Sequence, residues 1–77
     1  MSIEIRLKLA KRIKELRKFN KFTQDKLAEL SGVSYENIQK MESKKPHSAQ
    51  LDTLVKVAKA FKISVSDLLD FKNRNKK

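Results

Sequence analysis

The chain has 77 residues, which is enough for one small domain and leaves no room for a separate catalytic or ligand-sensing domain. It has no cysteine, which excludes disulfides and thiolate metal sites, and because secreted domains of this size usually carry disulfides, a cytoplasmic location is expected. The formal net charge of +10 is large for the size and indicates a polyanionic partner.

The first predicted element is an amphipathic helix over residues 3–19. Ser2 is a candidate N-cap, and lysines occupy the face that is expected to meet solvent. A basic amphipathic helix can also lie on an anionic membrane, but the helices that follow need an apolar partner, so no membrane contact is expected. No long apolar run precedes this helix, and neither a signal peptide nor a membrane span is expected. The predicted buried stripe is Ile5, Leu9, Ile13 and Leu16.

Residues 23–42 predict two short helices that are joined by a tight turn. Thr23 suits the N-cap of the first helix, and Gly32, the only glycine, suits a left-handed cap at its end. Ser34 suits the N-cap of the second helix, whose buried edge is expected at Ile38 and Met41. The other positions of the second helix are long, polar and varied, which predicts a surface that faces outward. They are Tyr35, Glu36, Asn37, Gln39 and Lys40.

This stretch resembles the helix-turn-helix of the phage repressor and Cro family, which is also called Xre-like. The matching residues are Gln24 at the start of the first helix, Ala28 where the helices cross, Gly32 in the turn, and Val33, Ile38 and Met41. The resemblance extends from about residue 9 to about residue 69. It implies an all-α fold, a compact five-helix repressor-like domain over residues 1–71 with the helix-turn-helix at helices 2 and 3. Residues 72–77 are then expected to form a basic flexible tail.

Three lysines stand where many members of the resembled family have glycine. They are Lys21, Lys44 and Lys62. A lysine at positive φ would be strained, so these turns are expected to differ slightly from the family's, with Asn20 taking the left-handed position in the first turn.

The remainder of the chain predicts a loop over residues 43–50 and two further helices. The fourth helix is expected to begin at residue 49 or 51 with Ser48 as its cap, and to end at Phe61. Its predicted core edge is Leu51, Leu54, Ala58 and Phe61, widened by Val55 and Val57. A fifth helix of about seven residues is expected after Ser64. Its apolar residues either all pack inward or partly form a two-fold dimer contact, and the dimer candidates are Val65, Leu68, Leu69 and Phe71.

Chemistry beyond binding has no support in the sequence. His47 is the only histidine, and without a cysteine or a second histidine it reads as an ordinary loop residue. There is no glycine-rich phosphate loop, no metal-ligand spacing and no evident pair of catalytic acids. We therefore expect no enzymatic activity, no metal, no cofactor and no small-molecule ligand.

The resemblance implies a sequence-specific transcriptional regulator, expected to act as a repressor, that binds double-stranded DNA as a homodimer. Helix 3 would enter the major groove. The expected base readers are Tyr35, Glu36, Asn37, Gln39 and Lys40, and the expected phosphate contacts are Arg17, Thr23, Gln24, Ser43, Lys44 and Lys45. In the resembled family an arginine in helix 1 pairs with a glutamate near the end of helix 3, which implies a structural pair of Arg17 and Glu42.

The distribution of charge leaves a second function open. Residues 1–22 carry eight Lys/Arg and two acids, residues 23–43 carry two Lys and four acids, and residues 44–77 carry nine Lys/Arg and three acids. Basic flanks suit phosphate contact. The acidic motif and the apolar fifth helix instead favour a protein-interaction module, such as an antitoxin-like binder of a partner protein, with DNA binding secondary.

Overall fold

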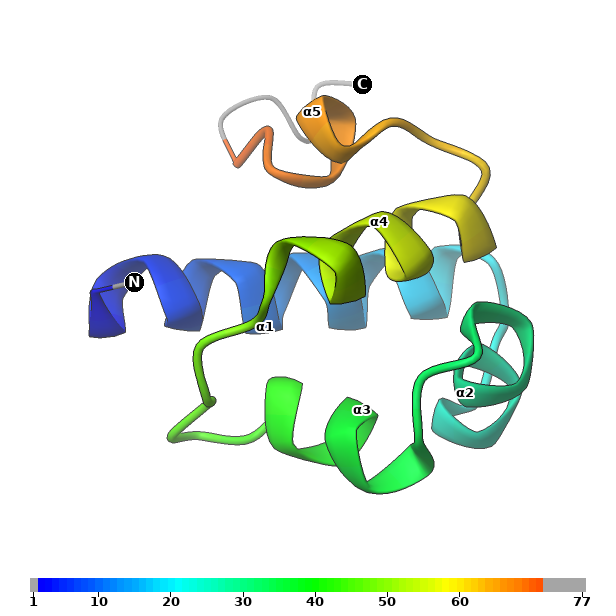
Figure 1. Cartoon of the computed structure of the whole chain (residues 1–77), viewed down its shortest axis with the longest axis horizontal. Coiled ribbons are helices and arrows are strands. Elements are labelled where there is room, and N and C mark those ends of the chain that lie inside the picture. The colour runs from blue at the N-terminus through cyan, green and yellow to red at the C-terminus, as the bar shows by residue number, and fades with distance from the viewer. Residues whose placement is uncertain (1, 72–77) are drawn as a thin grey trace.

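The computed structural model describes residues 2–71, which fold into five α-helices without a strand among them. The helices are α1 (Ile3–Phe19), α2 (Gln24–Ser31), α3 (Tyr35–Met41), α4 (Leu51–Ala60) and α5 (Val65–Leu68). In Figure 1, α1 and α4 lie side by side, α2 and α3 cover one side of this pair, and α5 lies on the other. The all-α, five-helix prediction is confirmed. The expected tail at 72–77 lies outside the described residues.

Serine and threonine caps fix where four of the helices begin. The hydroxyls of Ser2, Thr23, Ser34 and Ser64 each accept a hydrogen bond from the backbone N–H three residues later, at 3.0–3.2 Å. Such a bond satisfies an amide that would otherwise lack a partner in the first helical turn. At the end of α2, Gly32 has φ +77°, the left-handed conformation that the sequence predicted.

The start of α4 differs from the prediction. Its N-cap is Gln50, whose side chain makes no capping hydrogen bond. The residues before Leu51 are not helical, which places the Ser48 hydroxyl too early in the chain to cap the first turn. The side chains of Leu51 and Val55 were expected in the core but are 70% and 36% exposed, so the buried stripe of α4 begins only at Leu54.

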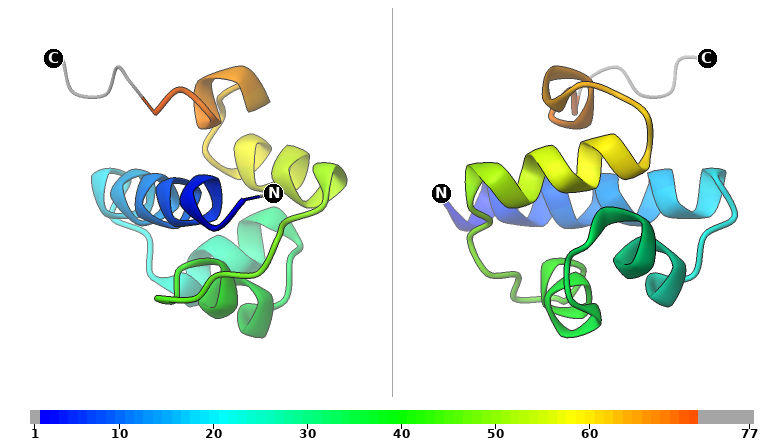
Figure 2. Two further views of the ribbon diagram at one scale, coloured as in Figure 1. Left: turned by 90° about the vertical axis from the view of Figure 1, so that its left-hand side faces the viewer. Right: turned by 45° about the vertical axis from the view of Figure 1, so that its right-hand side comes forward.

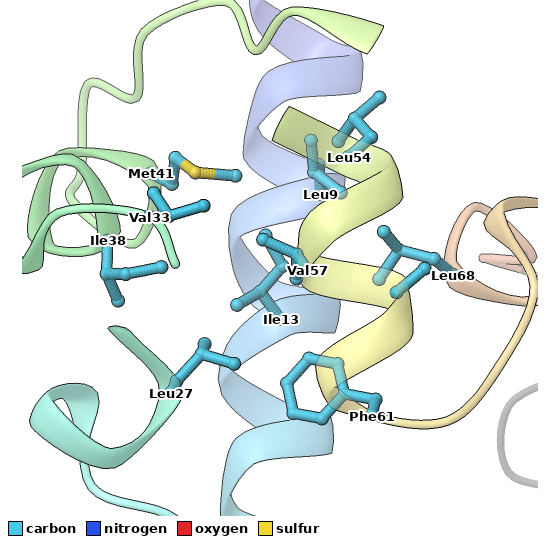
Figure 3. Close-up of a cluster of buried hydrophobic side chains, with 11 residues drawn as sticks. Leu9, Ile13, Leu27, Val33, Ile38, Met41, Leu54, Val57, Phe61 and Leu68 are labelled. Carbon is cyan, nitrogen blue, oxygen red and sulfur yellow. The ribbon is translucent and has the colours of Figure 1, made fainter. Parts of the chain in front are cut away.

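A single apolar core joins all five helices, and Figure 3 shows its side chains meeting between α1, α4 and the α2–α3 pair. Its members are Leu9, Ile13, Leu27, Val33, Ile38, Met41, Leu54, Val57, Ala58, Phe61 and Leu68. Ile5 was expected in the buried stripe of α1 but is 39% exposed. The reason is that the first turns of α1 extend past the helices that cover its middle (Figure 1).

The last helix is shorter than expected, because α5 has four residues and ends at a C-cap on Leu69. Arg12 on α1 reaches this end, with Nη2 2.9 Å from the carbonyl oxygen of Asp67 and Nε 3.3 Å from that of Leu68. An arginine suits this place because its cation and its N–H groups satisfy carbonyls that lack a partner at a helix end. Leu68 itself is 0% exposed. Of the two alternatives left open for this residue, inward packing or a dimer contact, the structure shows inward packing, because this chain's own core encloses the side chain.

The turns after α1 and α4 share one backbone conformation, which was predicted incorrectly. Lys21 and Lys62 have φ +59° and +60°, whereas Asn20 has φ −88°, so the lysine and not the asparagine is left-handed. In each turn the lysine N–H bonds the carbonyl three residues back, and the next N–H bonds the carbonyl five residues back, at 2.8–3.0 Å. This Schellman pattern normally uses glycine. For an L-residue the left-handed conformation costs roughly 1–2 kcal/mol.

Replacing either left-handed lysine with glycine is expected to stabilise the domain. Lys21→Gly and Lys62→Gly should each raise the free energy of unfolding by about 0.5–1 kcal/mol, because relief of strain exceeds the added entropy of the unfolded chain. For a domain of this size that corresponds to a rise in Tm of roughly 2–8 °C. Thermal unfolding followed by circular dichroism measures it, with Lys18→Gly inside α1 as a destabilising control. A lower Tm for both Lys21→Gly and Lys62→Gly would contradict the conclusion that the two lysines are strained.

Candidate nucleic-acid interface

The outward face of α3 is the most varied polar surface of the helix-turn-helix. Ile38 and Met41 turn inward and are buried, so the remaining side chains of this seven-residue helix point away from the core. All five predicted base readers are exposed: Tyr35, Glu36, Asn37, Gln39 and Lys40. In Figure 2, α3 lies at the edge of the molecule opposite α5, where no other helix covers it. The geometry leaves this face open to an elongated partner.

Two of these side chains are coupled to each other. Gln39 Nε2 donates a hydrogen bond to Tyr35 Oη at 3.2 Å, one helical turn apart. The bond restrains the tyrosine ring, and since the hydroxyl oxygen is the acceptor, its own proton stays available for another partner. Gln39 therefore supports Tyr35 in this structure, which the sequence did not suggest.

Glu42, at the end of α3, connects this helix to α1 and α2 through hydrogen bonds. Its carboxylate accepts two hydrogen bonds from Arg17, Nε–Oε2 at 2.8 Å and Nη2–Oε1 at 2.9 Å, and a third from Gln24 Nε2 at 3.2 Å. Arg17 Nη1 also donates to the carbonyl of Phe22 at 3.0 Å. The side chains of Glu42 and Arg17 are only 2% and 14% exposed. The hydrogen bond to Glu42 raises the pKa of Arg17, so its guanidinium stays charged wherever the protein is folded.

The structure separates the predicted phosphate contacts into two groups. Arg17 and Gln24 are directed inward onto Glu42, and the Thr23 hydroxyl caps α2, so these groups position the motif. Lys44 and Lys45 are exposed, and neither ammonium has a hydrogen bond or ion pair within residues 2–71.

The loop after α3 is anchored at its start and in its middle. Ser43 Oγ donates to the carbonyl of Lys40 at 2.9 Å, and Arg6 Nη1 of α1 donates to the carbonyl of the buried Pro46 at 3.2 Å. These bonds hold Lys44 and Lys45 between two fixed points beside α3. A polar hollow of about 270 Å³ separates the loop and the start of α4 from α3, and Lys40 and His47 are among its lining residues. Across residues 2–71, no group of three His, Cys, Asp or Glu side chains could hold a metal ion.

Sequence reasoning missed the two arginines of α1 that bind backbone carbonyls, Arg6 and Arg12. A signal was present, because the chain has 15 lysines and only four arginines. All three arginines of the described residues donate to other elements, whereas the lysines of α1 are exposed. Arginine presents several N–H groups in a rigid fork, which suits fixed acceptors better than lysine does. Among residues 2–71, each arginine therefore marks a position that is fixed by hydrogen bonds to another element.

Two short helices joined by a left-handed glycine, with a polar and uncovered second helix, define a helix-turn-helix DNA-binding protein. The sequence matches the Cro/C1-type HTH DNA-binding domain over residues 12–74, and the chain belongs to this family, which is not catalytic. A search of curated proteins finds no match to the chain. Within residues 2–71, no helix has both the length and the apolar character that crossing a membrane requires.

Proposed function

We propose that the protein is a sequence-specific transcriptional regulator that binds double-stranded DNA as a homodimer and acts as a repressor. One observation carries this proposal: α3 is fixed from inside by Ile38, Met41 and Glu42, while five different polar side chains face outward. A rigid helix with varied donors and acceptors suits the major groove, where each base pair presents its own pattern of polar groups.

Three side chains of the outward face have a chemical counterpart on DNA. Lys40 can donate to guanine O6 or N7, and Glu36 can accept from cytosine N4. Tyr35, restrained by Gln39, can contact a thymine methyl group or donate its hydroxyl proton to a phosphate. Lys44 and the neighbouring Lys45 then contact the DNA backbone. Arg17 and Gln24 contribute indirectly, because their hydrogen bonds to Glu42 hold α3 in position.

The proposed dimer uses apolar surface near α5. Val65, Leu69 and Phe71 are packed against the core but only partly buried, so part of their surface stays exposed. A domain with a core this small gains stability by association. Because α3 lies opposite α5, the two-fold axis would have to run from the α5 side toward the DNA, so that both α3 helices face the duplex on half-sites about 34 Å apart.

Selection of bound duplexes from a random DNA library at near-physiological salt tests the proposal. Enrichment of one sequence with two-fold symmetry is expected, and its half-site spacing locates the two α3 helices. Binding without an enriched sequence would contradict sequence-specific readout and leave only attraction between charges.

The exposed acids of the motif favour a second candidate, a module that binds a partner protein. Asp25, Glu29 and Glu36 are exposed on α2 and α3, and Lys26 lies 3.6 Å from the carboxylate of Glu29. This acidic surface repels phosphates and suits a basic partner protein. Co-purification with the product of a neighbouring gene, together with failure of the selection above, would favour this candidate.

Glu36→Gln is expected to increase affinity and reduce selectivity. Glu36 is exposed in the first turn of α3, and its charge is repelled by phosphates, so it acts chiefly against wrong base pairs. The variant should bind a mixed-sequence duplex several-fold more tightly and lose preference at one base pair, by about 1 kcal/mol or more. Titration of the selected duplex and of single-base-pair variants measures both effects. A lower Tm with unchanged preference would show instead that Glu36 stabilises only the helix.

A further inference from the structure

The two left-handed lysines lie at one end of the molecule. Phe22 follows Lys21 and Phe61 precedes Lys62, and the two aromatic rings stack with centroids 5.9 Å apart and an interplanar angle of 8°. The two turns are therefore neighbours with nearly identical φ angles and the same hydrogen bonds. In Figure 1, however, the chain leaves them in opposite directions, toward α2 after Lys21 and toward α5 after Lys62.

Contacts within the described protein do not explain why lysine stands at either position. Both residues are exposed, and neither ammonium takes part in a hydrogen bond or an ion pair with any residue from 2 to 71. Glycine would give the same turn without strain. Strain and the lack of an internal partner are common to both lysines, so only the place of each turn in the molecule can distinguish their roles.

The place of Lys21 suggests that role. It stands two residues before the Thr23 cap of α2, in the turn that leads from α1 into the helix-turn-helix (Figure 1). At this place the neighbouring polar groups are engaged, because Arg17 and Gln24 bind Glu42 and the Thr23 hydroxyl binds a backbone amide. Lys21 is exposed and close to them in the chain, and two turn hydrogen bonds hold its backbone in place.

We propose that Lys21 is a DNA-backbone contact, whose ammonium binds a phosphate that flanks the base pairs facing α3. The proposal rests on the proposed function and adds a residue to it. Lys62 makes no such contact, because its turn leads toward α5, on the side of α1 and α4 away from α3 (Figure 2). The chain thus contains its own matched control, a second lysine with the same charge, exposure and backbone conformation.

The test compares wild-type protein, Lys21→Gly and Lys62→Gly by titrating a mixed-sequence duplex of about thirty base pairs over a series of salt concentrations. A phosphate contact depends on charge and not on base sequence, so this probe does not require the operator. For Lys21→Gly we expect the slope of log K against log salt to become shallower by about 0.9, with a loss of about eightfold in affinity at 0.1 M salt. For Lys62→Gly we expect an unchanged slope.

Thermal unfolding of the same samples excludes loss of fold as the cause, since both variants are expected to melt above the wild type. A variant that gains stability while it loses DNA affinity would support the proposal. Equal losses in the two variants would overturn it, because they would show an effect of net charge alone, and so would an unchanged slope in both. If the wild-type protein bound no duplex, the proposed function would fail together with this inference, and that result differs from binding that ignores Lys21.

Discussion

Glu42→Ala is expected to lower the free energy of unfolding by about 3–5 kcal/mol, the largest loss of stability among the substitutions considered. The carboxylate accepts bonds from Arg17 and Gln24, and its removal leaves a guanidinium that is 14% exposed without its counter-charge. Small domains have little stability to spare, so this loss should reduce the folded fraction visibly at room temperature. Urea unfolding followed by circular dichroism measures the change.

A double substitution separates the burial of charge from the loss of packing. Arg17→Met combined with Glu42→Leu removes both charges together and should recover much of the stability that Glu42→Ala loses, because well-packed apolar side chains can replace a buried ion pair. A loss below about 1 kcal/mol for Glu42→Ala would contradict this account, since that is the value of an exposed surface pair.

Lys40→Ala is expected to have the largest effect on DNA recognition, with a loss of roughly 1–3 kcal/mol in binding to the selected duplex and a relaxed preference at one base position. Lys40 lies on the outward face of α3 and its side chain is exposed, so the fold should not change. Titrations with duplexes that differ at single base pairs measure the preference, and the Tm of the variant shows whether the fold is intact.

The matched control is Lys44→Ala, three residues beyond the end of α3 in the anchored loop. A phosphate contact should weaken binding to all sequences alike and make the salt dependence shallower by about one unit of slope. If Lys40→Ala also weakened binding to all DNA sequences by the same factor, Lys40 would not read a base, and α3 would not lie in the major groove in the assigned register.

Local sequence signals predicted the boundaries of the first three helices well. The bounds of α1 are those that the stripe and the Ser2 cap predicted, and Thr23, Gly32 and Ser34 delimit the helix-turn-helix as expected. These signals are reliable because a capping hydroxyl or a left-handed glycine acts within a few residues along the chain. The family match over residues 12–74 confirms the resemblance that these residues carried.

Features that depend on distant contacts were not predictable in the same way. Helical spacing places Leu51 on the core edge of α4 and Ile5 on that of α1, but both lie near helix ends that no neighbouring helix covers. Lys21 adopts positive φ because the Schellman turn satisfies carbonyl groups at the end of α1. The prediction considered only the cost of positive φ for a lysine and not the stabilisation from these hydrogen bonds. The roles of the exposed α3 residues on DNA stay predictions, since they depend on a partner.

The seven positions of α3 serve two purposes that do not overlap. Ile38 and Met41 face the core, Glu42 follows as the C-cap that binds α1 and α2, and the outward side chains contact no other helix through a hydrogen bond or ion pair within residues 2–71. Substitutions at exposed helix positions usually change stability by less than about 0.5 kcal/mol. If the outward face reads DNA as proposed, lineages that carry this scaffold could diverge in operator sequence through a few outward substitutions without changing the fold.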